Sequence, residues 1–293
     1  MHTVYPSFYP LFACKAGACR HTCCQKWEIA IDDRTAKTYQ HQPGELGKAL
    51  RKSMIHGAEG WQIVFNEKGF CPLLEADGLC RIVKEMGDEG LCDICRSHPR
   101  FYTYVDEYEL CGLGLCCEAA AELLLREKAG LLFDIDGQER ISLSALCERI
   151  GFAVPEEAFH VTGRITPLLY KEILEKYALT EPIDEAWTRR MAWYGDHEKE
   201  VLELLSRVSK RPAMQAFDPL LQYILYRRLE DIDVCGTEAV TAFAKAGALF
   251  IYMETVLTGS MAESMRRWSE QIEYDPDNVE LLLSKPVISG REG

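Results

Sequence analysis

The sequence lacks the motifs that mark several large enzyme classes. It contains no P-loop, no HExxH and no GxSxG, so a P-loop nucleotide hydrolase, a zincin protease and an α/β-hydrolase are not indicated. Its first residues, MHTVYPSFYPLFACKAG, show no basic leader followed by a long apolar run. We therefore expect a protein that is not secreted.

Basic residues are scarce as well. The chain has 33 Lys and Arg against 46 Asp and Glu, a formal net charge of -13. Nucleic-acid binding depends largely on clustered Lys and Arg, so nucleic acid is not expected as a partner. The most apolar stretch, Val240 to Leu257, contains Lys245 and Glu254 and falls short of the ~20 clean residues that a membrane span needs. We expect a buried core helix there, and no membrane partner.

Cysteine, by contrast, is abundant. The chain has 13 cysteines in 293 residues, a length that allows a packed core without disulfide support. Thiols in a chain without a secretory signal are expected to stay reduced, which predicts a cytoplasmic protein. Dense cysteines in such a compartment indicate metal or redox chemistry.

The cysteines are unevenly distributed. Eleven lie between Cys14 and Cys117, and only Cys147 and Cys235 follow. This asymmetry predicts two domains: residues 1–120, an irregular cysteine-rich metal-binding region, and residues 121–293, a helical part packed against it. The expected fold class is mostly α. Cys147 and Cys235 are interpreted as small apolar residues buried on helical faces.

Local patterns predict several elements. WEIAI, from Trp27 to Ile31, alternates like a short strand, and Asp32 or Asp33 can cap the helix that follows. After Pro99-Arg100, three tyrosines, Tyr102, Tyr104 and Tyr108, indicate a strand with aromatics on one face, which we expect to line the core or a cavity.

Helix signals dominate after Glu118. Asp218-Pro219 combines a capping residue with proline at the first helical position, and Asp275-Pro276 repeats that pattern. Thr237 is a further candidate cap. We expect the three corresponding helices to bury Leu221, Phe243 and Leu282 with their apolar neighbours.

The cysteine spacings are short and suit metal ligation, because ligands close in sequence converge on a metal easily. Adjacent cysteines at 23–24 and 116–117 are expected to give one ligand each, or to face different centres. Only Cys92 and Cys95 form the CxxC pair that a zinc ribbon uses twice, so zinc and an iron–sulfur cluster both remain open. His21 and His98 lie beside cysteines, but we expect them to be solvated or hydrogen-bonded.

One enzyme motif is incomplete. The radical S-adenosylmethionine signature is Cys-x3-Cys-x2-Cys; Cys19 and Cys23 provide the first half, but Lys26 occupies the third position. Radical chemistry is therefore not predicted from the spacing.

Four ordered segments resemble the flagellin lysine-N-methylase family: CKAGACRHTCCQKW from Cys14, CPLLEADGLCRIVKEMG from Cys71, CRSHPR from Cys95, and CEAA from Cys117. The second and third are also similar to the wider CxCxxCC group of zinc- or iron-chelating proteins. The segments span a little over a third of the chain, and DPLLQYILYRRL from Asp218 is more loosely similar to the C-terminal region of the family.

The resemblance implies a function and a set of site residues. It implies methyl transfer from S-adenosylmethionine to lysines of flagellin, in the cytoplasm, by a protein that contains a [4Fe-4S] cluster. The family's cysteines map onto Cys14, Cys19, Cys23, Cys24, Cys71, Cys80, Cys95 and Cys117, whereas Cys92, Cys111 and Cys116 look like extras. The alternative is a non-enzymatic module that chelates zinc or iron for structure or sensing.

Overall fold

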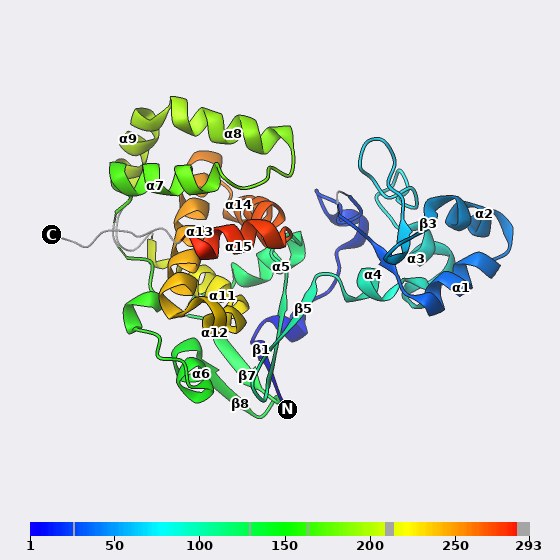
Figure 1. Ribbon diagram of the computed structural model, residues 1–293, viewed down its shortest axis with the longest axis horizontal. Helices are drawn as coiled ribbons and strands as arrows, with labels where there is room; N and C mark the ends of the chain where they lie inside the picture. The colour runs from blue at the N-terminus through cyan, green and yellow to red at the C-terminus, as the bar shows by residue number, and fades with distance from the viewer. Residues whose placement is uncertain (26, 129, 163, 209–213, 286–293) are drawn as a thin grey trace. The chain divides into compact units, whose positions relative to one another are not determined.

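The computed structural model describes residues 1–25, 27–128, 130–162, 164–208 and 214–285. It divides the chain into two compact units, each with its own hydrophobic core (Figure 1). Unit 1 comprises residues 1–12 together with residues 101–293, and unit 2 comprises residues 13–100. The predicted division into 1–120 and 121–293 does not follow these units, because the first strand pairs with strands more than 100 residues away.

Unit 1 is built on a five-stranded sheet in the order β5-β6-β1-β7-β8. The central strand, β1 (His2–Pro6), runs parallel to β6 (Tyr108–Leu113) and antiparallel to β7 (Leu132–Ile135). The edge strands are β5 (Arg100–Val105) and β8 (Glu139–Ser142). This sheet was not predicted as a whole, although the strand at Tyr102 was.

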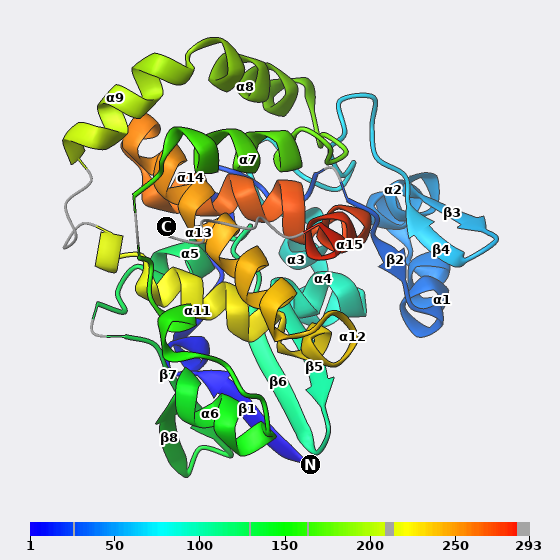
Figure 2. The ribbon, with the colours of Figure 1, turned by 60° about the vertical axis from the view of Figure 1, so that its left-hand side comes forward.

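Helices make up most of the rest of unit 1 that the structure describes, which confirms a mostly helical fold. Figure 2 shows α11 and α13 beside the sheet, with α7, α8 and α9 further away. The helices are α5 (Glu118–Leu124), α6 (Leu143–Ile150), α7 (Pro167–Tyr177), α8 (Glu185–Asp196), α9 (Glu198–Val208), α11 (Asp218–Arg227), α12 (Ile232–Cys235), α13 (Thr237–Thr258), α14 (Met261–Trp268) and α15 (Pro276–Ser284). A π-helical turn, Ser269–Glu273, follows α14.

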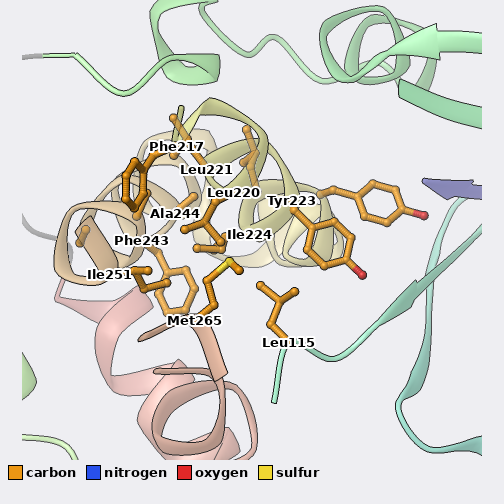
Figure 3. Close-up of a cluster of buried hydrophobic side chains, with 14 of the residues drawn as sticks. Leu115, Phe217, Leu220, Leu221, Tyr223, Ile224, Phe243, Ala244, Ile251 and Met265 are labelled. Atoms are coloured by element: carbon orange, nitrogen blue, oxygen red, sulfur yellow. The ribbon is translucent and has the colours of Figure 1, made fainter. Parts of the chain in front are cut away.

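The core of unit 1 lies where α11, α13 and α14 meet (Figure 3). Leu220, Ile224 and Met265 are fully buried there. Two tyrosines of α11 tie this core to the sheet: the Tyr223 hydroxyl donates to the Leu113 carbonyl at 2.7 Å, and the Tyr226 hydroxyl donates to the Val4 carbonyl at 2.9 Å. These bonds satisfy phenol groups that would otherwise be buried without partners.

Helix α13 is the predicted core helix. By length and composition it is apolar enough to cross a membrane, but 67% of its apolar window is buried inside the protein. Phe250 and Ile251 are fully buried, and Gly247 allows the Trp268 ring to approach so closely that a Cβ would lie 2.6 Å from it. The interpretation of Val240 to Leu257 as a core helix is confirmed.

The predicted helix starts have mixed outcomes. Asp32 and Asp275 are confirmed as caps, since each carboxylate accepts backbone N–H groups of the following helix. Asp218 lies one residue inside α11, and its carboxylate accepts from the Val161 N–H and contacts the His160 ring instead. Thr237 is likewise inside its helix, whose N-cap is Gly236 at a φ of 84°. Glycine can adopt this left-handed conformation without the strain that a side chain brings.

Unit 2 is more regular than expected. It contains α1 (Asp33–His41), α2 (Gly44–Ser53), α3 (Arg81–Met86) and α4 (Asp93–Ser97), with a small sheet in the order β2-β4-β3. Its strands are β2 (Ala30–Ile31), β3 (Met54–Gly57) and β4 (Gly60–Ile63). The predicted strand from Trp27 is thus reduced to its last two residues. The prediction of an irregular region missed these helices.

Two side-chain predictions were wrong. Tyr102 and Tyr104 are on a strand, as expected, but 46% and 57% exposed, so they do not line the core, whereas Tyr108 on β6 is buried as predicted. Cys235 ends the short helix α12 and is exposed, whereas Cys147 is buried as predicted. In each case, the sequence pattern identified the element but not which of its faces is covered.

Candidate metal centre

Backbone pairing brings two distant cysteine segments of unit 2 together. Gln25 and Phe70 form an antiparallel bridge, and the Cys71 N–H donates to the Cys24 carbonyl at 2.9 Å. The turn before Phe70 is fixed by the Asn66 side chain, which accepts from the N–H groups of Lys68 and Phe70. The Cys24 and Cys71 segments are therefore held side by side.

The loop from Cys71 to Cys80 folds back on itself. Leu74 and Cys80 form a second antiparallel bridge, and the Asp77 carboxylate accepts from the Leu79 N–H at 3.1 Å. At the tip, Gly78 has a φ of 79°, in the region that favours glycine. This turn returns the chain so that Cys80 lies beside the start of the loop.

A third segment adds the CxxC pair. Cys92 is the N-cap residue of α4 and Cys95 lies in its first turn. The Asp32 carboxylate joins this helix to α1, because it accepts from the Thr35 N–H at 2.9 Å and from the Asp93 N–H at 3.1 Å. Cys80 occupies the same N-cap position of α3. Helix N-termini favour negative charge, so both positions suit thiolates.

Five cysteines thus belong to a single core, which we call the cysteine core: Cys24, Cys71, Cys80, Cys92 and Cys95. Cys71 and Cys92 are buried, and the other three are partly buried against the same cluster. The surrounding residues, Ile29, Tyr39, Leu73 and Ile82 among them, are apolar or aromatic. The core is consequently largely shielded from solvent.

The sulfurs of the cysteine core influence each other's charge. Burial is the main cause that raises the pKa of Cys71 to about 12, and the nearby Cys24, Cys80 and Cys92 contribute in the same direction. Burial also raises the pKa of Cys80, opposed by the backbone N–H groups of Val83 and Ile82. Several thiolates therefore cannot coexist here without a cation.

Two side-chain pairs depart from this trend. A hydrogen bond from Cys95 lowers the pKa of Cys92 and raises that of Cys95 itself. A hydrogen bond with Cys23 lowers the pKa of Cys24 to about 7. In each pair one sulfur accepts while its neighbour keeps the proton, so each pair contains one sulfur that readily becomes a thiolate.

The remaining predicted ligands of unit 2 are outside the cysteine core. Cys14 and Cys23 are exposed and Cys19 is partly exposed. The loop that carries Cys14 and Cys19 packs on the Cys71–Cys80 loop, since a Cβ on Gly17 would lie 2.9 Å from the Asp77 carbonyl oxygen. The Ala16 N–H donates to the Cys14 Sγ at 3.3 Å.

The other cysteines belong to unit 1. Cys117, a predicted ligand, is the N-cap residue of α5, and Cys111 lies in β6. The Cys116 Sγ contacts the Tyr274 hydroxyl at 2.9 Å. Among the predicted ligands, the structure therefore groups Cys24, Cys71, Cys80 and Cys95, and it adds Cys92. The CxxC spacing was the signal that could have identified Cys92.

The cysteine core fits a thiolate-bound metal by the chemistry of its donors. Five thiols in one apolar cluster are the donor set that zinc and iron–sulfur clusters use. In the described parts of the chain, no three Cys, His, Asp or Glu side chains are already arranged around one point as metal ligands would be. The thiols are gathered, and a bound metal would have to complete their alignment.

A surface depression of about 630 Å³ lies on the same unit. It is lined by two arginines, Arg34 and Arg96, by Asp88 and Glu89, and by Met86 among others. Gly90 forms part of its wall and accepts a 2.7 Å hydrogen bond from Tyr39, a residue of the cysteine core's cluster. The lining combines cationic, anionic and apolar groups, which suits a ligand that carries both charges.

Comparison with known proteins places the chain in a family. No protein-family model matches it, and no solved structure matches it. It is 30% identical over 129 residues to a lysine-N-methylase of Salmonella typhimurium and to one of Salmonella choleraesuis, matches that cover 42% of this chain. The matched region spans about a third of these two relatives, 32% of their length. It is also 30% identical to the flagellar biosynthetic protein FliU of Salmonella muenchen, over 76% of that protein. The chain therefore belongs to the flagellin lysine-N-methylase family.

Proposed function

We propose that this chain is a cytoplasmic protein-lysine N-methyltransferase that takes methyl groups from S-adenosylmethionine, acts on flagellin and contains a [4Fe-4S] cluster. Relatives named lysine-N-methylase support the methyl transfer, and the name of the FliU relative supports a flagellar substrate. The observation that carries the metal part is the cysteine core, with five thiols in one small apolar cluster.

The cysteine core would hold the cluster. A [4Fe-4S] cluster requires four of the core's five thiols, and we assign Cys80 and Cys92 to that set because they stand at helix N-termini where a thiolate is stabilised. When bound, the cluster would supply iron–thiolate bonds that organise unit 2, and a redox centre. The resemblance alone proposes four further ligands, which lie outside this core: Cys14, Cys19, Cys23 and Cys117.

The transfer itself places demands on the protein. A lysine ammonium must first lose a proton to a base; its nitrogen lone pair then forms a bond to the methyl carbon. The carbon–sulfur bond of the sulfonium breaks, and its electron pair stays on sulfur to give the neutral thioether. Desolvation of the amine, or a carboxylate or tyrosine beside it, would promote the first step.

We propose that the methyl donor binds in the depression of unit 2. S-adenosylmethionine carries a carboxylate, an ammonium and a sulfonium, and the depression offers two guanidinium groups beside Asp88 and Glu89. Met86 offers apolar contact for the adenine ring. Replacement of Arg96 by Gln should therefore raise the Kd for S-adenosylmethionine in calorimetry, whereas an unchanged Kd would exclude this placement.

The enzyme proposal is tested by methyl incorporation. Protein purified without oxygen is incubated with labelled S-adenosylmethionine and flagellin, and label on lysine is measured by mass spectrometry. We expect incorporation by the unmodified protein and by Cys147→Ala, whose thiol is buried in the core of unit 1. Cys80→Ala should lose both metal and activity. Absence of transfer by protein with an intact cluster and authentic flagellin would refute the methyltransferase.

The zinc alternative is distinguished by metal analysis of the same preparation. A colourless protein with tightly bound zinc and no sulfide would support a tetrahedral structural site instead. Brown protein containing iron and sulfide in similar amounts would support the cluster.

A further inference from the structure

The outer face of the five-stranded sheet carries polar and aromatic groups. Thr3 and Glu109 are register partners on β1 and β6, and Val4 and Leu110, the next pair, point to the core instead. On β5, Tyr102 and Tyr104 alternate with the buried Thr103 and Val105. Because side chains alternate along a strand, the exposed tyrosines share the face that bears Glu109.

Glu109 is surrounded by neutral donors on this face. Its carboxylate accepts from the Tyr104 hydroxyl at 3.1 Å and from the Thr3 hydroxyl at 3.4 Å, and the Cys111 Sγ lies 3.8 Å away. The carboxylate raises the pKa of the Tyr104 phenol, which therefore remains a donor. Burial and Glu109 together raise the pKa of Cys111 to about 11. The group thus fixes the position of one partly buried negative charge.

Glu109 and Asp134, two acidic residues of the same sheet, differ in their partners. Asp134 is paired with Arg140, whose guanidinium makes two bonds of 3.0 Å to it. In the part of the chain that the structure describes, Glu109 takes part in no ion pair. A carboxylate held by three uncharged groups beside two exposed tyrosine rings is complementary to an external cation.

We propose that Glu109, Tyr102 and Tyr104 bind the side-chain ammonium of a lysine presented by the protein substrate. This inference rests on the proposed lysine methylation and assigns it a substrate-binding site. Glu109 supplies the opposite charge, and the tyrosine rings offer electron-rich faces to the cation.

The proposed site should also bind a methylated lysine side chain. Methylation leaves the charge on nitrogen but removes N–H donors, so the contribution of hydrogen bonds to Glu109 falls while the contribution of the rings persists. The site should accept both forms and reject acetyllysine, which has no charge. It is a recognition site for the substrate chain, and we assign it no proton transfer.

The test is a binding measurement with short synthetic peptides. The peptides are identical and otherwise neutral, and carry one lysine, one trimethyllysine or one acetyllysine; binding to the full chain is followed by NMR titration. We expect Glu109→Gln to raise the Kd of the lysine peptide about fivefold, which is the upper range for an exposed ion pair. Tyr102→Leu should raise the Kd of the trimethyllysine peptide about threefold.

Two controls separate the site from general effects. Glu107→Gln removes an exposed charge from the same hairpin and should leave binding unchanged, whereas equal losses in both glutamate variants would refute the site. Tyr104→Phe keeps the ring and removes only the bond to Glu109, so its trimethyllysine affinity should be retained. Equal binding of acetyllysine would also refute the inference.

The outcome is separable from that of the proposed function. If flagellin is methylated but Glu109→Gln leaves the peptide Kd unchanged, the site is refuted and the methyltransferase stands. If the peptides bind through Glu109 but no methyl group is ever transferred, the site stands and the methyltransferase is refuted.

Discussion

A buried histidine in unit 2 gives a quantitative prediction. Burial lowers the pKa of His98 from 6.5 to about 4, and its ring lies 5.5 Å from that of Trp27. Since the folded pKa is the lower one, the unfolded chain binds more protons between these values. The resulting stability is fully present above pH 6.5 and is lost as the pH falls towards 4. At about 1.4 kcal/mol per pKa unit, the loss amounts to about 3 kcal/mol.

The quantity to measure is the free energy of opening of unit 2 in the metal-free protein. Hydrogen exchange of the amides in α1 and α2 reports it. Other groups titrate in this range, so the quantity to compare is the difference between the unmodified protein and His98→Leu. That difference should change by about 3 kcal/mol between pH 7 and pH 4, in favour of the variant at low pH.

A matched variant in unit 1 should behave in the opposite sense. The Asp218 carboxylate raises the pKa of His160. The stabilisation of the fold by protonated His160 is therefore present below pH 6.5 and is lost as the pH rises through the folded pKa. His160→Gln should therefore destabilise α11 more at pH 5 than at pH 8. A pH-independent difference for His98→Leu would refute the reasoning for unit 2.

Three further predictions concern packing, capping and ligation. Gly112→Ala places a Cβ 2.2 Å from the Phe101 ring and 2.9 Å from the Tyr223 hydroxyl, and should lower the free energy of unfolding by about 3 kcal/mol in urea denaturation; a loss near zero would contradict this packing. Asp275→Ala removes the cap of α15 and should cost about 1 kcal/mol, whereas Asp275→Asn should cost much less. Cys92→Ala should lose bound metal, although resemblance alone assigned Cys92 no role; full retention would exclude it as a ligand.

Much of the helical part could be predicted from the sequence because its signals are local. Asp275-Pro276 and Asp32 precede helices, and both side chains accept the backbone bonds that such positions predict. Asp218 has the same sequence pattern but bonds to the His160 segment. The His160 segment, which is distant in the sequence, binds the Asp218 carboxylate in place of the helix N-terminus. A local sequence pattern does not reveal such a partner.

The sheet of unit 1 was missed for a related reason. β1 is only five residues long, and its partners follow more than 100 residues later. Short strands of this kind are specified by pairing and burial more than by their own residues. The exposure of Cys235 and of Tyr104 likewise depends on which side of an element other elements cover.

The cysteine spacing identified the type of ligand and the region of the chain that carries it. It did not identify which cysteines belong to the cysteine core. Cys14 and Cys19 belong to the first of the four segments that carry the resemblance, yet they are outside the core, whereas Cys92 is inside it. The deciding contacts are between segments: the Gln25–Phe70 bridge and the bonds of Asp32 to both α1 and α4. Such contacts become visible only in the fold.

The most direct test of the central claim is the iron, sulfide and zinc content of protein purified without oxygen, measured for the unmodified chain, Cys80→Ala and Cys147→Ala. A [4Fe-4S] cluster in the cysteine core predicts about four irons and about four sulfides per chain in the unmodified protein and in Cys147→Ala, and a large loss in Cys80→Ala. Unmodified protein without iron and sulfide, or Cys80→Ala with its full content, would contradict the claim.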